Sequence, residues 1–417
     1  MTSYQEALAL LEYSSKFGIA PTLEGATILT RWIGDPQLSY PCVQIAGTNG
    51  KSSTSRFIAA FLHSQKKKVG LYTSPELVEH PERMEIDNTV VSRERFALAV
   101  FKAHEAALKA IAAGEILSAT QFELFTAAAL WLFAEEKVDF AVLEAGLGGR
   151  WDATSVATPK VAVITGVGLD HTELLGDTVE KIAVEKAAII KSGCIPILGP
   201  GTAETRSAFL ERCEEVGVTP IIVEPDDYLD GYGLSFSRYP SYQKQNIACA
   251  LAATQAALGQ PLDFSAIQHV LDTLTIPGRF ELLRQQPPLL IDASHNPQSA
   301  QVLAQVLREN QGFDEISGRI RGFDTLLLGV LVEKDAEGII SILTPLFENL
   351  VVTQSHSPRA ISAEALADRV RQTTGRKPEV FPTVAAALGE LTRREAAVVA
   401  TGSITLAGDV KRVWCDL

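Results

Sequence analysis

The chain has 417 residues, and its 37 lysines and arginines against 50 aspartates and glutamates give a formal net charge of −13. This acidic balance argues against a general nucleic-acid binder, although a local basic cluster can still attract a small anionic substrate. The length favours more than one domain, and a hydrophobic content of 46 % is enough for large buried sheets.

The most informative stretch, residues 46–53, reads Ala-Gly-Thr-Asn-Gly-Lys-Ser-Ser. It follows an apolar run, Cys42–Ile45, that we expect to be a buried strand, and it precedes a segment with apolar residues on one helical face. A glycine-rich turn between strand and helix leaves backbone N–H groups free to hold phosphate oxygens, and Lys51 adds a full positive charge. Ser52 or Ser53 can offer a hydroxyl to magnesium.

The usual phosphate-loop pattern has a glycine five residues before Gly50, where this chain has Ile45. We therefore interpret residues 47–52 as a shortened phosphate loop. The alternative is an ordinary tight turn with a surface lysine, which the strand before and the helix after it disfavour.

Further apolar runs recur along the chain with helical patterns between most of them. Continuous runs of Val, Ile and Leu suit strands buried on both faces of a parallel sheet. We expect them at Val69–Thr73, Phe140–Leu143, Val161–Thr165, Ile195–Leu198, Ile221–Val223, Leu289–Ile291, Thr325–Val330, Leu350–Thr353 and Ala397–Ala400. The alternating, aromatic segment Leu234–Ser241 predicts a short antiparallel patch.

The pattern is interrupted at Gly278 and again at Gln285–Pro288, and a second alternating series starts at Leu289. We therefore predict an α/β protein with a domain boundary near residue 283. Residues 1–283 would form an N-terminal phosphate-loop nucleotide-binding domain with a mostly parallel sheet. Residues 284–417 would form a smaller Rossmann-like α/β domain.

Polar residues follow two of the predicted strands, and in open parallel sheets ligands bind at the carboxyl ends of strands. Glu144 ends one such run and is placed to hold magnesium, although a salt-bridged glutamate explains it equally well. Asp170 could fix the tautomer of His171 after the next strand. Lys186 lies in a predicted helix, and its chemistry alone favours a solvated side chain.

Asp292 and His295 follow the first strand of the second domain, and Asn296 with Pro297 makes a good helix start. Serine hydrolase chemistry has little support, because the chain contains no Gly-x-Ser-x-Gly elbow.

Together these residues resemble the folylpolyglutamate synthase/dihydrofolate synthase family, relatives of the Mur ligases. The resemblance spans nearly the whole chain and rests on several motifs in the family's order. They are Gly47–Lys51, Tyr72–Pro75, Thr120–Glu123, Leu143–Arg150, Leu169–Thr172 with Leu175-Gly176, Glu185–Ala187, Pro277–Phe280, Asp292 with His295–Pro297, Lys334-Asp335, Ser357–Arg359 and Thr401–Ser403.

The resemblance implies a role for each matching position. The ATP phosphates would be held by Gly47, Thr48, Asn49, Gly50, Lys51, Ser52 and Ser53, and further nucleotide contacts would come from Asn246, Arg279 and Asp292. Two magnesium ions would be bound by Ser53, Ser74, Glu144, His171 and Lys186, the last as a carbamate. The pterin side would be formed by Thr120, Gln121, Phe122, Glu123, Trp151, Asp152 and Ala153. The catalytic set would be Lys51, Lys186, His295 and Ser403, with His295 and Ser403 near the incoming glutamate.

The implied reaction moves the γ-phosphate of ATP onto a folate carboxylate, and the amine of L-glutamate then attacks the acyl phosphate. The small-molecule partners would be ATP, a reduced folate and L-glutamate, with magnesium and with potassium as a further candidate ion. We expect no nucleic-acid or membrane partner, a monomer, and a cytoplasmic location, since five scattered cysteines indicate a reduced protein and no secretory signal is present.

Four positions depart from the family pattern. Ser52 replaces a common glycine, Glu76 stands where histidine is frequent, and Trp151 replaces leucine. Ala20 stands near an aspartate that contacts dihydropteroate in bifunctional members, which favours folylpolyglutamate synthase over a bifunctional enzyme.

Two other classes are weighed against this interpretation. A Mur-type peptide ligase is disfavoured because the phosphate loop begins at residue 47, which leaves no room for a uridine-nucleotide domain. A non-catalytic nucleotide switch is disfavoured because Glu144 and His171 are both present.

Overall fold

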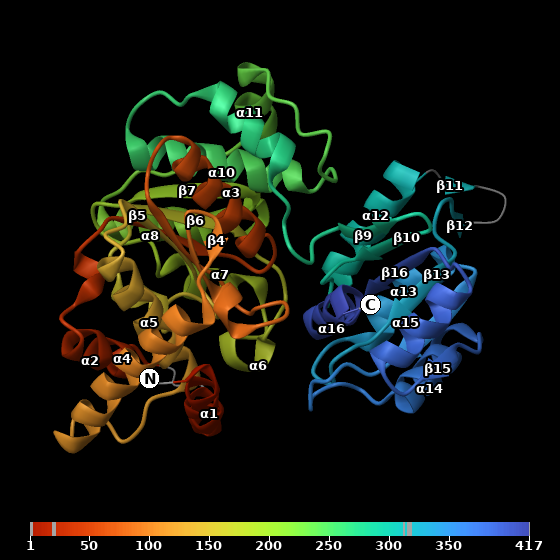
Figure 1. Cartoon of the computed structure of the whole chain (residues 1–417). Coiled ribbons are helices and arrows are strands. Elements are labelled where there is room, and N and C mark those ends of the chain that lie inside the picture. The colour runs from red at the N-terminus through yellow and green to blue at the C-terminus, as the bar shows by residue number, and fades with distance from the viewer. Residues whose placement is uncertain (1–2, 19–21, 312, 315–318, 417) are drawn as a thin grey trace. The chain divides into compact units, whose positions relative to one another are not determined.

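The computed structural model describes residues 3–18, 22–311, 313–314 and 319–416. The chain divides into two compact units (Figure 1). The N-terminal unit contains Met1–Glu76, His80–Tyr239 and Gln243–Leu274, and the C-terminal unit contains Leu77–Glu79, Pro240–Tyr242 and Thr275–Leu417. Each unit is built on its own sheet with helices, which confirms the predicted α/β class.

The N-terminal unit is built on an eight-stranded sheet with the order β4-β3-β2-β5-β1-β6-β7-β8. Its strands are β1 (Cys42–Ala46), β2 (Val69–Tyr72), β3 (Met84–Ile86), β4 (Thr89–Val90), β5 (Phe140–Glu144), β6 (Val161–Gly166), β7 (Ile195–Gly201) and β8 (Ile221–Ile222). All neighbours pair in parallel except β3 with β2 and β4 with β3. The predicted mostly parallel sheet is confirmed, and the antiparallel edge was not predicted.

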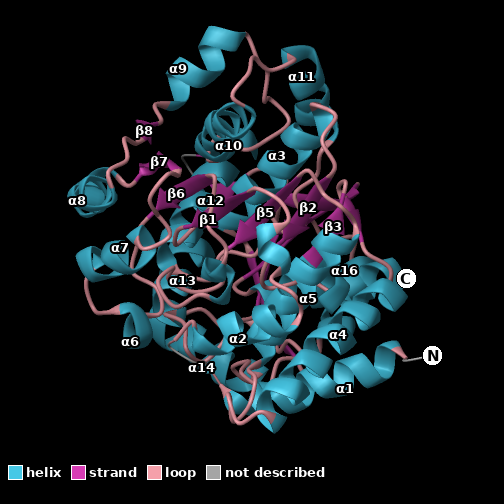
Figure 2. Ribbon diagram, turned by 90° about the vertical axis from the view of Figure 1, so that its left-hand side faces the viewer, coloured by secondary structure: helices cyan, strands magenta, loops and turns pink. Residues whose placement is uncertain are grey.

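Helices cover both faces of this sheet. They are α1 (Tyr4–Ser14), α2 (Glu24–Trp32), α3 (Lys51–Ser64), α4 (Arg93–Ala112), α5 (Gln121–Glu135), α6 (Thr172–Leu175), α7 (Val179–Ala187), α8 (Arg206–Val216), α9 (Pro225–Leu229), α10 (Gln243–Leu258) and α11 (Phe264–Thr273). Short 3-10 helices lie at Ser15–Phe17, Pro36–Leu38, His80–Arg83, Ala153–Val156, Ala203–Thr205 and Asp230–Tyr232. Figure 2 shows α3 and α10 on one side of the sheet and α5 and α7 on the other.

Burial follows the predicted apolar pattern. Phe57, Ile58 and Phe61 of α3 are fully buried, as their spacing predicts. The run Thr126–Ala134 belongs to α5, which packs in a core cluster of this unit. Within the described part of the chain, no helix combines the length and the apolar character needed to cross a membrane.

The C-terminal unit has a six-stranded sheet with the order β15-β14-β13-β16-β10-β9. Its strands are β9 (Glu281–Gln285), β10 (Pro288–Ile291), β13 (Thr325–Leu328), β14 (Asn349–Thr353), β15 (Glu379–Phe381) and β16 (Val398–Thr401), and a separate pair is formed by β11 (Phe313–Asp314) and β12 (Arg319–Ile320). Its helices are α12 (Pro297–Gln311), α13 (Ala336–Leu343), α14 (Ala363–Thr374), α15 (Val384–Arg393) and α16 (Ile404–Asp416), with a 3-10 helix at Thr344–Leu346. Only the edge strand β9 runs antiparallel to its neighbour in this six-stranded sheet.

The prediction of an antiparallel patch at Leu234–Ser241 is wrong, because this segment contains no strand. Its polar and aromatic groups bond helices instead of another strand. The backbone N–H of Ser235 donates to Gln268 Oε1 at 2.8 Å, and the Tyr239 hydroxyl donates to the Leu274 carbonyl at 2.6 Å. The Tyr239 ring packs edge-on against Phe57 at 5.1 Å.

The pair of glycines where β6 and β7 end gives a test of how tightly the sheet is packed. Gly166 pairs with Gly201, and a Cβ atom at Gly201 would lie 2.9 Å from Gly166 Cα. We expect Gly201→Ala to destabilise the protein by about 1–3 kcal/mol through overpacking of backbone against backbone. Gly231→Ala, where a Cβ meets nothing within 4 Å, is the control. Equal thermal midpoints of the two variants would contradict this reading of the sheet.

Candidate active site

The phosphate loop is held in place by the end of the neighbouring strand β6. The backbone N–H of Thr48 donates to the Gly166 carbonyl at 2.9 Å, and the Thr165 hydroxyl donates to the Asn49 carbonyl at 2.7 Å. A Cβ atom at Gly47 would lie 1.9 Å from Thr165 Oγ1, so this position accommodates only glycine without rearrangement. Thr165, which the sequence analysis did not single out, is the one polar side chain of its otherwise apolar strand.

Gly50 lies in the loop as the N-cap residue of α3. It adopts the left-handed conformation, with φ of 86°, which a glycine reaches without steric cost. A Cβ atom here would lie 2.4 Å from Asn246 Oδ1. Asn246 lies on α10, is buried, and donates to Gln243 Oε1 at 2.8 Å. The predicted nucleotide residue Asn246 therefore packs directly against the phosphate loop.

Two lysine side chains converge on the backbone of this loop. Lys51 Nζ donates to the carbonyls of Gly47 and Thr48 at 3.0 and 3.1 Å, and Lys186 Nζ donates to the same Gly47 carbonyl at 3.0 Å. Lys186 is only 4 % exposed. Burial, with a smaller contribution from the nearby Lys51 charge, lowers the pKa of Lys186 to about 7. Positive charge is therefore concentrated where a phosphate loop holds anionic oxygens.

The carboxylate of Glu144 lies beside this loop. Glu144 ends β5 and is 1 % exposed. Its Oε1 accepts from the Ser52 hydroxyl at 2.7 Å, and its Oε2 accepts from the backbone N–H of Ser74 at 3.2 Å. The structure therefore brings three predicted residues together, with Ser52 contacting Glu144. Ser53 faces elsewhere, since its hydroxyl accepts from Gln243 Nε2 at 3.2 Å.

The residues around Glu144 fit a magnesium ion. The Ser74 hydroxyl is buried and has no hydrogen-bond partner, which is costly for a polar atom unless a ligand completes its environment. Carboxylate, hydroxyl and phosphate oxygens are the ligands that magnesium prefers. In the part of the chain that the structure describes, no three His, Cys, Asp or Glu side chains form a metal-binding group. A cation at Glu144 would therefore draw on hydroxyl and phosphate oxygens.

His171 lies at the start of α6 with its side chain about half exposed. Its backbone N–H donates to Asp170 Oδ1 at 3.0 Å, and its Nε2 is 3.9 Å from Asp170 Oδ2. The two side chains are close, but 3.9 Å is longer than a hydrogen bond, so the tautomer role of Asp170 stays a prediction.

The predicted pterin side begins at the N-terminus of α5, where Thr120 and Glu123 cap each other. The Glu123 N–H donates to Thr120 Oγ1 at 3.3 Å, and the Glu123 carboxylate accepts from the Thr120 N–H and hydroxyl at 2.8 Å each. This capping box fixes the start of the helix that carries Gln121 and Phe122, which are both partly buried. Phe122 lies over Gly146, where a Cβ atom would be 2.6 Å from the ring, and 6.2 Å from the Tyr72 ring.

The second predicted pterin segment follows β5. Asp152 is buried, and burial raises the pKa of its carboxyl group, while the N–H groups of Leu147 and Thr154 donate to it at 2.9 and 3.0 Å. Asp152 therefore holds the loop after β5 in place through hydrogen bonds to its backbone. Ala153 is buried, and Trp151 is 49 % exposed, which leaves an aromatic ring available at the surface.

The remaining predicted residues lie at one edge of the C-terminal sheet, since β10 and β16 are parallel neighbours. Asp292 follows β10 and accepts from the N–H groups of Phe280 and Ser294 at 2.8 and 2.9 Å. Phe280 is the residue after Arg279, so Asp292 is bonded to the chain beside that arginine. His295 Nδ1 bonds the Ala293 carbonyl at 2.9 Å. Ser403 follows β16, is buried, and its hydroxyl accepts from the Leu406 N–H at 3.1 Å.

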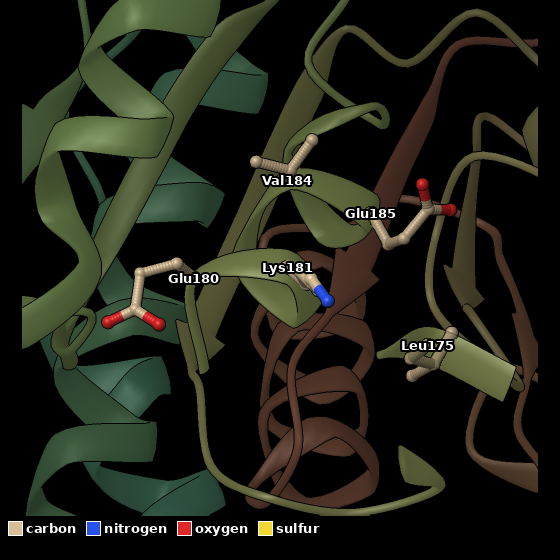
Figure 3. Close-up of a pocket in the computed structure, with 5 residues that line it drawn as sticks. All are labelled: Leu175, Glu180, Lys181, Val184 and Glu185. Carbon is tan, nitrogen blue, oxygen red and sulfur yellow. The ribbon is translucent and has the colours of Figure 1, made fainter. Parts of the chain in front are cut away.

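A surface depression of about 400 Å³ lies along α7 and contains none of the predicted site residues. It is lined by Leu175, Glu180, Lys181, Val184 and Glu185 (Figure 3). In Figure 3 the Glu180 carboxylate points away from Lys181 and Glu185. Glu185 also pairs with Arg150 at 3.0 Å, so this side of α7 is bound to the loop after β5.

Comparison with known proteins places this geometry in a family. Residues 45–194 match the Mur ligase middle domain, and residues 278–404 match the Mur ligase glutamate ligase domain. A dihydrofolate synthase/folylpolyglutamate synthase of Mycobacterium tuberculosis is 34 % identical over 84 % of this chain and 77 % of its own length.

Two solved structures superpose on nearly the whole chain. The folylpolyglutamate synthase of Mycobacterium tuberculosis complexed with ADP has a TM-score of 0.86 and 30 % identity, covering 99 % of this chain and 98 % of the other. A bifunctional folylpolyglutamate synthase/dihydrofolate synthase with Mn, AMPPNP and L-glutamate bound has a TM-score of 0.83 and 27 % identity, and both chains are fully covered. The chain belongs to the folylpolyglutamate synthase/dihydrofolate synthase family of the Mur ligase superfamily.

Proposed function

We propose that this protein is an ATP-dependent ligase that adds L-glutamate to the γ-carboxylate of a reduced folate through an acyl phosphate. The observation that carries the proposal is the phosphate loop on which Lys51 and Lys186 converge, next to the carboxylate of Glu144. The related structures that hold ADP, or Mn with AMPPNP and L-glutamate, support the use of ATP and a divalent metal.

The residues of the N-terminal unit divide the work of the first step. The backbone N–H groups of the loop and the start of α3 would hold the ATP phosphates, and Lys51 would neutralise charge on the phosphoryl group as it moves to the folate carboxylate. Magnesium, when bound, would neutralise further phosphate charge, and Ser74 and Glu144 would hold it. We include two magnesium ions with Ser53, His171 and Lys186 among their ligands, and potassium, as parts of this proposal.

The second step is attack of the glutamate amine on the acyl phosphate, which gives the amide and phosphate. We assign the region around Phe122 and Trp151 to the pterin ring, because aromatic rings there offer stacking surfaces. We assign His295 and Ser403, at the edge of the C-terminal sheet, to the incoming glutamate.

The wider organisation belongs to the same proposal. The predicted division makes residues 1–283 the ATP-binding domain and residues 284–417 the glutamate-ligase domain of a cytoplasmic monomer, whereas the compact units divide nine residues earlier, between Leu274 and Thr275. A bifunctional enzyme that also accepts dihydropteroate is the second candidate, favoured by the bifunctional name of the Mycobacterium tuberculosis relative. The departure at Ala20 lies outside the described residues.

Replacing Lys51 tests the first step. We expect Lys51→Ala to lower kcat/KM by at least about a hundredfold, because preorganised charge at the transferring group is worth that much in comparable sites. The assay measures ADP release together with the mass gain of the folate. Lys102→Ala, an exposed lysine of α4 that pairs with Glu105, is the matched control. Ligation by Lys51→Ala at a near-normal rate would refute the assignment.

Acceptor choice distinguishes the two candidate activities. We expect tetrahydrofolate to be at least about tenfold better than dihydropteroate in kcat/KM, since losing a charged contact to the pterin costs on the order of 1.4 kcal/mol or more. Both acceptors are compared side by side with saturating ATP and L-glutamate. Comparable rates would establish the bifunctional enzyme instead.

Carbamylation of Lys186 is a third prediction. The modification needs a neutral amine, and a pKa of about 7 makes the neutral form available at and above neutral pH. We expect ¹³C-bicarbonate to label the wild-type protein, with less label as the pH falls below about 7. Lys186→Ala should lose the label and the activity, and acetate should restore part of the activity.

Lys181→Ala provides the control for this experiment, because Lys181 lies on the same helix but is exposed and pairs with Asp177. It should keep both the label and the activity. Wild-type enzyme that takes up no label from ¹³C-bicarbonate and is still fully active would exclude the carbamate.

A further inference from the structure

Three partly buried side chains form a cluster just beyond Ser74. The carboxylate of Glu76 uses both of its oxygens, since Oε1 is 2.5 Å from His80 Nδ1 and Oε2 is 2.5 Å from Arg83 Nε. The guanidinium group of Arg83 lies 4.2 Å from the centre of the Phe125 ring, and the His80 ring packs edge-on against the same ring at 5.3 Å. We call these three residues the Glu76 clamp.

The clamp fixes the backbone on both sides of Ser74. On one side, the N–H of Thr73 donates to the carbonyl of Arg83 at 3.0 Å. On the other side, the side chain of the same Arg83 holds the carboxylate of Glu76. Ser74 and Pro75 are therefore bracketed by one arginine, which binds the chain before them through its main chain and after them through its guanidinium group.

The bracket matters because of the way the chain runs after Glu76. Residues 77–79 group with the C-terminal unit, and the chain rejoins the N-terminal unit at His80. The hydrogen bond between Glu76 and His80 joins the residues directly before and after segment 77–79. Without it, Ser74 would lose a restraint close to the point at which the chain departs.

Ser74 itself is poised for a ligand. Its backbone N–H donates to Glu144 Oε2 at 3.2 Å, and its hydroxyl is buried without a partner. We propose that Glu76 is a positioning residue that, through His80 and Arg83, keeps Ser74 against Glu144 for metal–nucleotide binding. This inference rests on the proposed function and adds to it a residue at which the chain departs from its family's pattern.

The test measures the affinity of the full-length protein for Mn²⁺ in the presence of AMPPNP. The electron paramagnetic resonance signal of free Mn²⁺ reports how much of the ion remains unbound. We expect Glu76→Met, which removes both acceptors but keeps the side-chain length, to weaken Mn²⁺ binding on the order of tenfold, as loss of an outer-shell partner does elsewhere. Glu76→Gln keeps one acceptor for Arg83 and a donor that can meet His80. It should therefore recover most of the affinity.

Glu136→Met is the matched control. Glu136 is a mostly buried carboxylate that also holds two basic side chains, Lys68 and Arg95, and belongs to the same unit. Its loss should lower thermal stability while leaving Mn²⁺ affinity unchanged. His80→Phe keeps an aromatic ring against Phe125 and should weaken Mn²⁺ binding by a smaller factor, about threefold, which provides a second measurement if Glu76→Met does not fold.

The outcomes distinguish failure of this inference from failure of the proposed ligase function. If wild-type protein binds Mn²⁺ with AMPPNP and Glu76→Met or His80→Phe binds it equally well, the clamp serves stability alone and the inference is overturned. If wild-type protein binds no Mn²⁺ with AMPPNP, the proposed ligase function fails and the inference fails with it. A selective loss in Glu76→Met that Glu76→Gln reverses supports the positioning role.

Discussion

The site depends on one arrangement, in which two lysine ammonium groups share a single backbone carbonyl. Lys51 and Lys186 both donate to the Gly47 carbonyl at 3.0 Å. Removal from water and, to a smaller extent, the nearby Lys51 charge disfavour the charged form of Lys186, so the arrangement favours whatever supplies negative charge. An anion on the loop, or conversion of one ammonium into an anionic group, would relieve that strain. The requirement for a negative partner is therefore built into the fold before any substrate arrives.

Both units gather their functional side chains by the same physical means. In a parallel sheet, strands that neighbour each other end at the same edge, so residues distant in sequence meet there. In the N-terminal unit this brings the loop after β1 into contact with Glu144 at the end of β5 and with Thr165 near the end of β6. In the C-terminal unit it brings Asp292 and Ser403 to adjacent strand ends.

Much of this was visible in the sequence, because continuous apolar runs mark buried strands and the polar residues after them mark strand ends. The central parallel strands and the place of Glu144 follow from that pattern, whereas β3, β4, β9 and β15 carry no such run and were not predicted. The environment of Lys186 does not, since a lysine in a short helix has the same local sequence whether it faces solvent or the loop. The choice between Ser52 and Ser53 depends on the rotation of α3, which is set by packing. The strand predicted at Leu234–Ser241 is wrong because aromatic residues that pack against helices can alternate with polar residues in the same way as residues of a strand.

The capping box at the start of α5 limits how this protein can diverge. Thr120 and Glu123 hold each other, and a Cβ atom at Gly25 of α2 would lie 2.1 Å from the Glu123 carboxylate. Apart from threonine to serine and glutamate to glutamine, none of the three positions can change alone without loss of a cap or a steric collision. Acceptable changes are therefore coupled. Position 120 keeps serine or threonine, position 123 keeps glutamate or glutamine, and position 25 keeps glycine. If the surface beside this capping box binds the pterin as proposed, its preference can vary through Phe122 and Trp151 while the three capping positions change only together.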